Sequence, residues 1–277
     1  MKLAVVTIVK DRTRHLRAHL AGLRRSHLRP DQHVVVTMGD ADVEMVVQEE
    51  QSSAVVVELE YRHGPLPLAH ARNVGAARAL ALGAEALVFL DVDCIASPQL
   101  LGKYRDAIMT THAEPILWCG PVTYLPAPVD GFAALDMLAL LRNPHRARPD
   151  PKDGQLANEE NYDLFWSLSF AVSVPTWRSL PGFCEEYIGY GGEDTDFACA
   201  AHDRGVGLRW IGGADAYHQF HPVSDPPIEH LHDILANAYV FYRRWGRWPM
   251  EGWLRSFEKM NLLDFDRSSG RWVRSRR

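Results

Sequence analysis

The first hundred residues alternate between short apolar runs and longer stretches in which apolar residues recur at helical spacing. Four runs rich in apolar and β-branched residues predict buried strands: Leu3–Val9, His33–Thr37, Ala54–Glu58 and Ala86–Leu90. Between them, helices are predicted after Asp11, with Leu16, Leu20 and Leu23 on one face, and over His70–Leu82. Buried strands that alternate with helices indicate an α/β domain with a mostly parallel sheet. Such sheets bind ligands at the carboxyl ends of their strands.

Beyond Pro98 the pattern is less regular. It predicts a strand at Ile116–Gly120 and an apolar segment at Phe165–Val174. Helices are predicted over Phe132–Leu141, Asp194–Asp203, Glu229–Trp245 and Glu251–Lys259. Residues 143–161 are polar, contain three prolines and show no period, which is typical of a loop that acts as a lid. The last seven residues hold four arginines and predict a solvated tail.

Composition narrows the functional classes. The 277 residues are 47% hydrophobic and 23% charged, as in ordinary globular proteins. A formal net charge of −5 and a pI near 6.2 argue against a nucleic-acid-binding protein. No segment approaches the ~20 apolar residues of a membrane span, and the apolar start is too short for a signal peptide. We therefore expect a cytoplasmic protein whose four well-separated cysteines are free thiols.

Two carboxylates directly follow the strand at Ala86–Leu90, in Asp91-Val92-Asp93. If the chain bends at the end of the strand, both side chains can reach one ligand. Carboxylate oxygens suit Mg²⁺ or Mn²⁺, and a cation held by few protein groups keeps positions free for phosphate oxygens. The triplet alone is equally compatible with a solvated turn, but its position after a buried strand favours a metal and nucleotide site.

A second motif combines glycines, an aromatic residue and acids in Gly189-Tyr190-Gly191-Gly192-Glu193-Asp194-Thr195-Asp196. Glycines allow a close approach of the backbone, and acids are favoured where a helix begins. A glycine turn with capping acids would explain part of this pattern. The functional interpretation makes Asp194 a general base that removes a proton from a sugar hydroxyl.

A third motif carries two histidines three residues apart, His218 and His221. Histidine is the commonest transition-metal ligand, and a nitrogen ligand favours Mn²⁺ over Mg²⁺. Either histidine alone could equally be a polar loop residue. Several other histidines are expected to have no role at a metal: His15, His19, His27 and His33.

Basic and aromatic residues supply further candidates. Lys10-Asp11-Arg12 ends the first strand, and His70-Ala71-Arg72-Asn73 opens the later helix, an arrangement that favours a diphosphate. Ordinary charged loops would look similar, and neither segment has a phosphate-binding glycine motif. Tyr190 and Trp166 are candidates for stacking on a sugar ring, whereas Trp245, Trp248 and Trp253 are expected to pack in the core.

In this order, the segments resemble metal-dependent glycosyltransferases of the GT-A fold, of the family 2 type. The chain looks most like bacterial relatives of the β-1,4-galactosyltransferases. The similarity rests on Val9–Leu16, on Asn73–Gly75 through Phe89–Asp93, and on Gly189–Asp196. It spans about residues 3–222. We expect a GT-A domain over 1–225, with a nucleotide-sugar half (1–110) and an acceptor half (111–225), and a helical extension with a basic tail over 226–277.

The resemblance implies a role for each matched position. Asp93 would be the principal metal ligand, Asp194 the catalytic base and Glu193 a sugar contact. Nucleotide contacts would come from Lys10, Asp11, Arg12, Arg72, Asn73, Asp91 and Val92. Acceptor contacts would come from Tyr190, Gly191, Gly192 and Trp166. Tyr190 stands where the family has a tryptophan.

The family's late metal ligands are a methionine and a histidine three residues apart. Matching His218 and His221 to them is preferred, and the alternative matches Asp215 and His218. The resemblance implies an inverting transfer from a nucleotide-diphospho-sugar, most simply UDP-linked, to an acceptor hydroxyl, with Mn²⁺ or Mg²⁺. A metal-dependent nucleotidyltransferase and an inactive sugar-nucleotide-binding module are the alternatives.

Overall fold

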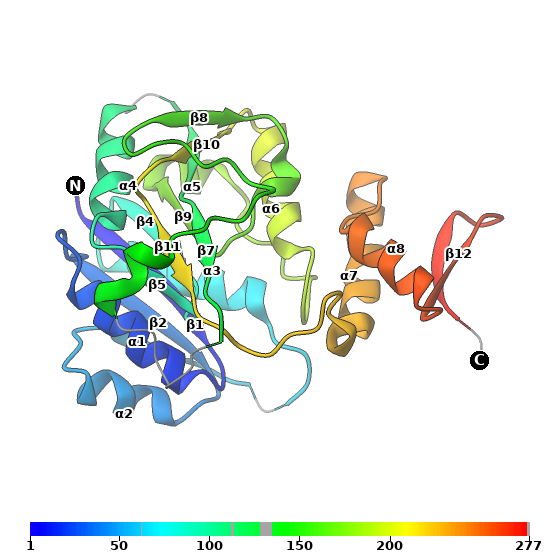
Figure 1. Ribbon diagram of the computed structural model, residues 1–277, viewed down its shortest axis with the longest axis horizontal. Helices are drawn as coiled ribbons and strands as arrows, with labels where there is room; N and C mark the ends of the chain where they lie inside the picture. The colour runs from blue at the N-terminus through cyan, green and yellow to red at the C-terminus, as the bar shows by residue number, and fades with distance from the viewer. Residues whose placement is uncertain (62, 112–113, 128–134, 276–277) are drawn as a thin grey trace.

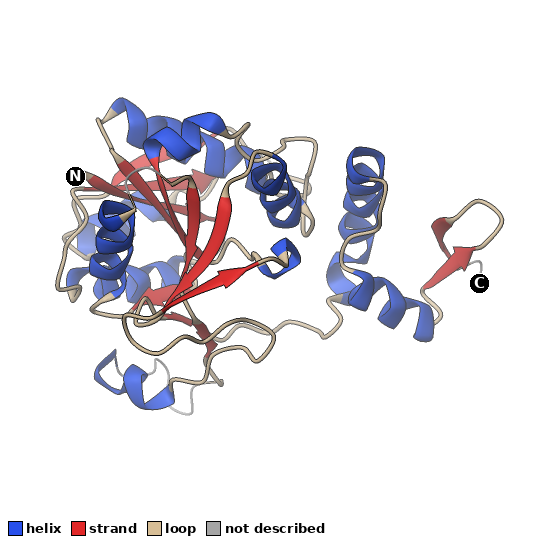
Figure 2. Ribbon diagram, turned by 90° about the horizontal axis from the view of Figure 1, so that it is seen from above, coloured by secondary structure: helices blue, strands red, loops and turns tan. Residues whose placement is uncertain are grey.

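The structure is a computed structural model that describes residues 1–61, 63–111, 114–127 and 135–275. Within those residues, eight strands form one sheet in the order β3-β2-β1-β4-β9-β6-β10-β8, with helices on both faces (Figures 1 and 2). The strands are β1 (Leu3–Val9), β2 (Gln32–Met38), β3 (Val55–Leu59), β4 (Ala86–Leu90), β6 (Ile116–Cys119), β8 (Leu156–Glu159), β9 (Ser169–Ser173) and β10 (Gly207–Ile211). Only β9 and β8 run against the others, so the sheet is mixed and mostly parallel, as predicted.

The alternation of side chains along each strand builds a core on both faces of the sheet. In β1, Ala4 and Val6 pack toward one face, whereas Leu3 and Val5 pack toward the other. The first face is covered by α3 (Leu68–Ala81) and α6 (Glu193–Asp203). The second face is covered by α1 (Thr13–Arg24), α2 (Asp42–Glu49) and α4 (Leu100–Thr110). A short helix, α5 (Val174–Ser179), follows β9. Because both faces are buried, the strands read as continuous apolar runs in the sequence.

A second, smaller sheet lies beside the carboxyl end of β4. It consists of β5 (Cys94–Ala96), β11 (Ala216–His218) and β7 (Val122–Tyr124), in the order β5-β11-β7. The antiparallel register of β11 and β5 sets His218 opposite Cys94. This pairing brings the histidine motif to the turn that carries the two carboxylates.

The C-terminal segment forms a smaller unit beside the α/β body (Figure 1). It contains α7 (Leu231–Trp245), α8 (Glu251–Lys259) and a hairpin of β12 (Leu263–Asp266) and β13 (Arg271–Arg274). The predicted tail is not unstructured over Arg271–Arg274, because these residues pair with β12 and Trp272 is only 1% exposed, whereas both arginines are exposed as predicted. The last two residues, 276 and 277, lie outside the described part of the chain.

Two other expectations need correction or restriction. The segment 143–161 is not a loop throughout, because Leu156–Glu159 forms β8 and pairs with β10 at the edge of the sheet. For the helix predicted over Phe132–Leu141, the structure has a 3₁₀ helix at Leu135–Leu141, and residues 132–134 lie outside the described residues. Among the helices that the structure describes, none is long and apolar enough to cross a lipid bilayer.

Candidate active site

The paired carboxylates lie in a turn at the carboxyl end of β4, held from two sides. The backbone N–H of Asp91 donates to O of Leu168 at 3.0 Å, and the N–H of Cys94 closes the turn onto O of Asp91 at 2.8 Å. From the other side, the N–H of Gln219 donates to O of Asp93 at 2.7 Å. Both side chains therefore project from one hydrogen-bonded turn at the end of the strand. Val92 instead points into the core and is 7% exposed, so its side chain is shielded from a ligand.

Asp93, His218 and His221 form the one candidate metal cluster that the described residues contain. Nε2 of His218 lies 3.3 Å from Oδ2 of Asp93, and Nε2 of His221 lies 3.6 Å from the same oxygen. One ligand atom from each of the three residues lies within 4.8 Å of the other two. Asp215 lies elsewhere, where its Oδ1 accepts a hydrogen bond of 2.7 Å from Nε of Arg142.

Asp93 supplies the negative charge of this cluster. Burial alone would raise the pKa of Asp93, but the two histidines hold it far below its usual range. Burial would lower the pKa of His218, and the neighbouring Asp93 carboxylate raises it instead. The other oxygen of Asp93, Oδ1, is buried without a hydrogen-bond partner among the described residues. An anionic oxygen with an unused lone pair beside two imidazole nitrogens is a donor set that Mn²⁺ accepts.

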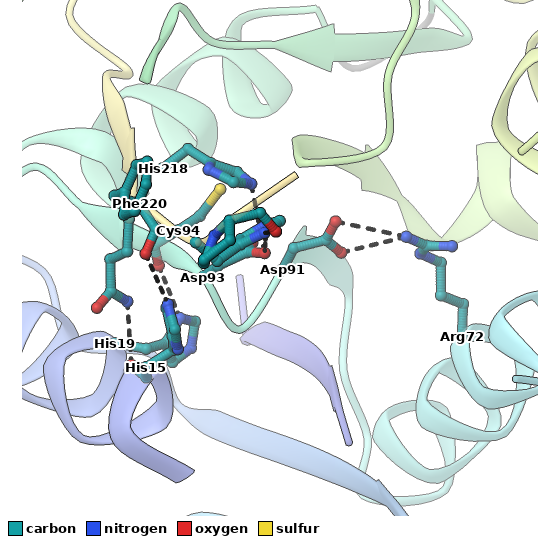
Figure 3. Close-up of polar contacts among 11 residues, drawn as sticks. His15, His19, Arg72, Asp91, Asp93, Cys94, His218 and Phe220 are labelled. Carbon is teal, nitrogen blue, oxygen red and sulfur yellow. Dashed lines mark hydrogen bonds and ion pairs between the residues drawn. The ribbon is translucent and has the colours of Figure 1, made fainter. Parts of the chain in front are cut away.

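Three residues for which the sequence suggested no active-site role, Thr7, His15 and His19, support the carboxylate turn or the histidine segment beside it. Nδ1 of His19 donates to O of Cys94 at 2.8 Å, because a carbonyl can only accept (Figure 3). Burial lowers the pKa of His19 to about 4, so the ring is neutral and its Nε2 accepts from Oγ1 of Thr7 at 3.0 Å. Nε2 of His15 contacts O of Phe220 at 3.2 Å. In the sequence, these supporting residues are marked only as polar positions among apolar ones, His19 on the apolar face of a helix and Thr7 within an apolar strand.

Arg72 links the two carboxylate motifs. Its Nη1 donates to Oε1 of Glu193 at 3.0 Å. Its Nη2 donates to Oδ1 of Asp91 at 3.2 Å (Figure 3). Arg72 and Glu193 are 5% and 6% exposed, so this is a buried bridge. Burial raises the pKa of Asp91 to about 6, against the lowering effect of Arg72. Asn73 is not brought to this cluster, because its amide bonds to the backbone of Phe183.

The basic segment after β1 lies at the same edge of the sheet, since β1 and β4 are parallel neighbours. Nζ of Lys10 donates to O of Gly39 at 3.2 Å and lies 3.2 Å from Oδ1 of Asp11. The Asp11 side chain is 74% exposed. Arg12 is partly exposed and directly precedes α1. These three residues are thus available to a ligand without contacting the metal cluster.

The acids of the second motif begin α6, as predicted. Burial, followed by the negative charge of Glu193, raises the pKa of Asp194 to about 7. Its Oδ1 accepts from the backbone N–H of Thr195 at 2.7 Å. Oε2 of Glu193 is buried without a hydrogen-bond partner among the described residues. A carboxyl group that exchanges its proton near pH 7 has the affinity that a general base requires.

Asp196, the third acid of the motif, has different contacts from Glu193 and Asp194. It is 1% exposed, and its Oδ1 accepts from Nε of Arg244 at 2.6 Å, from Nε1 of Trp245 at 2.7 Å and from the hydroxyl of Tyr187 at 3.1 Å. Two of these donors come from α7. The third acid therefore anchors the C-terminal unit to the helix that carries Asp194.

The glycines on either side of Tyr190 leave room for side chains of the C-terminal unit. A Cβ atom at Gly189 would lie 2.2 Å from Oδ2 of Asp233, and one at Gly191 would lie 2.8 Å from Sδ of Met250. At these two positions the absent side chain therefore also makes room for the C-terminal unit. At Gly192, which directly precedes α6, a Cβ would meet the ring of Tyr187 instead.

The two aromatic candidates have different surroundings. The ring of Tyr190 stacks on His230, with centroids 4.5 Å apart, and lies 5.8 Å from the ring of Trp253. Trp166 lies apart from this stack, 4.9 Å from the ring of His145 and under the guanidinium of Arg148. Trp253, expected to pack in the core, contacts Tyr190 from α8.

The mixed sheet, with its carboxylate turn after β4, defines an α/β fold of the GT-A type. Solved structures support this assignment. GalNAc-T7 with UDP, GalNAc and Mn²⁺ matches at a TM-score of 0.59 and 13% identity, over 87% of this chain and 50% of that one. S. aureus TarS matches at 0.60 and 16% identity, over 91% of this chain and 45% of that one. TarS 1–349 in complex with UDP-GlcNAc matches at 0.60 and 13% identity, over 94% and 78% of the two chains.

These similarities confirm the predicted fold. The chain spans about half the length of the first two chains that it matches. The sequence matches no protein family and no curated protein.

Proposed function

We propose that this protein is a metal-dependent inverting glycosyltransferase that moves a sugar from a UDP-sugar to an acceptor hydroxyl. One observation carries the proposal: Asp93, His218 and His221 converge at the carboxyl end of β4, with Oδ1 of Asp93 left without a partner in the described structure. The similar structures support the donor class, since GalNAc-T7 was solved with UDP and TarS 1–349 with UDP-GlcNAc. We also propose that the enzyme is of the family 2 type, related to the β-1,4-galactosyltransferases, and that it acts in the cytoplasm.

In this proposal, Asp93, His218 and His221 hold a Mn²⁺ or Mg²⁺ ion. When bound, the ion neutralises the charge of the leaving diphosphate. Asp91 lies on the nucleotide side, where Arg72 fixes its orientation through the bond to Oδ1. Lys10, Asp11 and Arg12 contact the nucleotide from the end of β1.

Asp194 takes the proton of the acceptor hydroxyl as that oxygen attacks the anomeric carbon from the face opposite the diphosphate. A single displacement of this kind inverts the configuration of the anomeric carbon. Above pH 7 the Asp194 carboxyl is ionised and can accept the proton. Glu193, held by Arg72, contacts a sugar hydroxyl with its unpaired oxygen. Tyr190 borders the acceptor.

The proposal is tested with nucleotide sugars and two metal conditions. Thermal unfolding is measured with UDP-, GDP- and dTDP-sugars, each with Mn²⁺ and with EDTA. We expect a UDP-sugar to raise the melting temperature only with Mn²⁺, because a ligand of the native state stabilises it by mass action. The bound donor is then incubated with a panel of glycoside acceptors, and the products are analysed by mass spectrometry and by NMR of the anomeric proton.

Each outcome decides between specific functions. Addition of one sugar residue with an inverted anomeric centre supports the proposal. Addition of a nucleotidyl group identifies a nucleotidyltransferase, and binding without turnover for any acceptor favours an inactive binding module. If no nucleotide sugar raises the melting temperature, or if EDTA has no effect, the proposal is wrong.

A further inference from the structure

Arg148 is a buried cation that the proposed mechanism does not use. It is 6% exposed, although its neighbours Arg146 and Ala147 are exposed. Its Cζ atom lies 4.8 Å from the ring centroid of Trp166 and 5.8 Å from that of Trp210. Nη2 makes one long hydrogen bond, of 3.4 Å, to O of Gly120.

The remaining donors of Arg148 are unused. In the described part of the chain, its Nε and Nη1 are buried without a hydrogen-bond partner, and no ion pair includes this residue. Nε1 of Trp210, on one of the two indoles that it contacts, is a further buried donor without a partner there. The nearby Arg142 shows the usual pattern, since it pairs with Asp150 and Asp215. A buried charge is normally paired, because its desolvation is costly.

Arg148 lies beside the proposed transfer site. Trp166, under its guanidinium, is two residues from Leu168, whose carbonyl holds the N–H of Asp91. On the same side, the ring of His145 lies 4.9 Å from Trp166 and 5.9 Å from Tyr124, whose ring is 4.7 Å from His218. An unbroken series of ring contacts therefore joins Arg148 to the metal cluster.

Neighbouring protein groups compensate this charge only in part. Contact with the indole faces stabilises a cation, but it leaves the N–H groups in the guanidinium plane unsatisfied. Ordered water could satisfy those donors without supplying a negative charge. Nε–H and Nη1–H point in different directions within the guanidinium plane, and each can donate to an oxygen of a carboxylate or phosphate. Since Nε and Nη1 are buried, an anion reaches them by displacing neighbouring residues, and the adjacent stretch 145–147 is exposed.

We propose that Arg148 binds an anionic group, a carboxylate or phosphate, on one of the sugar substrates. This inference rests on the proposed function. The anionic group can belong to either substrate. It is a carboxylate on the sugar of the donor, or a carboxylate or phosphate on the acceptor sugar. The specificity of the enzyme for charged over neutral substrates then comes from one buried side chain.

The first test measures stability without substrate. Arg148→Met keeps the apolar length of the side chain and removes the charge, and Arg146→Met is the matched control at an exposed position of the same segment. We expect the melting temperature of Arg148→Met to equal or exceed that of the parent, because an unpaired buried charge is removed. A clear fall in the melting temperature, absent in the control, would show that Arg148 stabilises the fold, and would overturn the inference.

The second test measures binding to the full chain by calorimetry. In the donor arm, UDP-glucuronic acid is compared with UDP-glucose, both with Mn²⁺. In the acceptor arm, glucuronic acid and glucose 6-phosphate are compared with glucose, in the presence of UDP and Mn²⁺. We expect Arg148→Met to weaken the binding of one anionic probe by at least about tenfold. Binding of the neutral counterpart should weaken by less than about twofold. Arg148→Lys keeps the charge without the planar donors, and we expect its affinity for the anionic probe to lie between those of the parent and Arg148→Met.

The two proposals fail in different ways. If UDP binds with Mn²⁺ but no anionic probe is preferred by the parent, or if the variant weakens charged and neutral probes equally, only the role of Arg148 is wrong. If the parent does not bind UDP at all, the proposed function is wrong and this inference with it.

Discussion

Replacing Asp194 with asparagine separates the contribution of this residue to catalysis from its effect on stability. The amide side chain of Asp194→Asn would keep the shape of the carboxyl group and the acceptor for the N–H of Thr195, but it could not take a proton. Loss of a general base lowers the rate of transfer by about 10²- to 10⁴-fold. The parent enzyme should also lose activity below pH 7, because protonated Asp194 cannot accept the acceptor's proton.

Asp194→Asn lowers the activity but should raise the stability of the protein. Burial and Glu193 raise the pKa of Asp194 from 3.8 to about 7, so between these values the folded state holds a proton that the unfolded state has lost. The free energy of unfolding of the parent therefore falls as pH rises through this interval, by about 4 kcal/mol in total. Asp194→Asn does not titrate. It should be more stable than the parent, with about 2 kcal/mol of the difference developing between pH 5.5 and pH 8.

Urea unfolding at several pH values, together with transfer rates, tests both effects. Asp203→Asn is the control, since this acid lies at the end of the same helix with its side chain 62% exposed. We expect the control to match the parent in activity and in pH dependence. The reasoning is refuted if Asp194→Asn keeps transfer within about tenfold of the parent, or if its stability gain over the parent is the same at pH 5.5 and pH 8.

Two further predictions concern the anchor of the C-terminal unit and the metal. Asp196→Asn should destabilise the protein by about 1.5–3 kcal/mol, because it removes the charged acceptor of the hydrogen bonds from Arg244 and Trp245; urea unfolding measures this, and an unchanged midpoint would contradict the anchoring role. His221→Ala should weaken Mn²⁺ binding in the UDP complex by at least about tenfold in a calorimetric titration. His232→Ala, whose side chain is 83% exposed, should leave the affinity unchanged, and an equal loss in both variants would exclude His221 as a ligand.

Local sequence patterns predicted the α/β body well because its strands are buried on both faces. Leu3–Val9 and Ala86–Leu90 were predicted with their observed bounds, since continuous apolar runs between helices have few other stable arrangements. The carboxylate turn after β4 followed from the same pattern. The edge strand β8 was missed because it is polar and only half-buried, so nothing in its sequence distinguishes it from a loop.

Contacts between distant segments were decided by the tertiary structure. No local pattern shows that Asp196 binds α7 rather than a substrate, or that Gly189 and Gly191 admit the C-terminal unit. The domain boundary at residue 225 stays a prediction. Thr7 and His19 became visible as supports only once β1, α1 and the turn were brought together.

The sequence by itself determined the class of fold and the residue types of the candidate site, because hydrophobic period and motif order are local properties. Only the tertiary structure decided which of those residues meet. The antiparallel pairing of β11 with β5 brings His218 to Asp93, across more than a hundred residues of chain. The burial of Arg148 near two indoles likewise depends on segments far apart in the sequence. Charges and pKa values follow from such contacts, so the chemistry of the site could not be derived from residue identities alone.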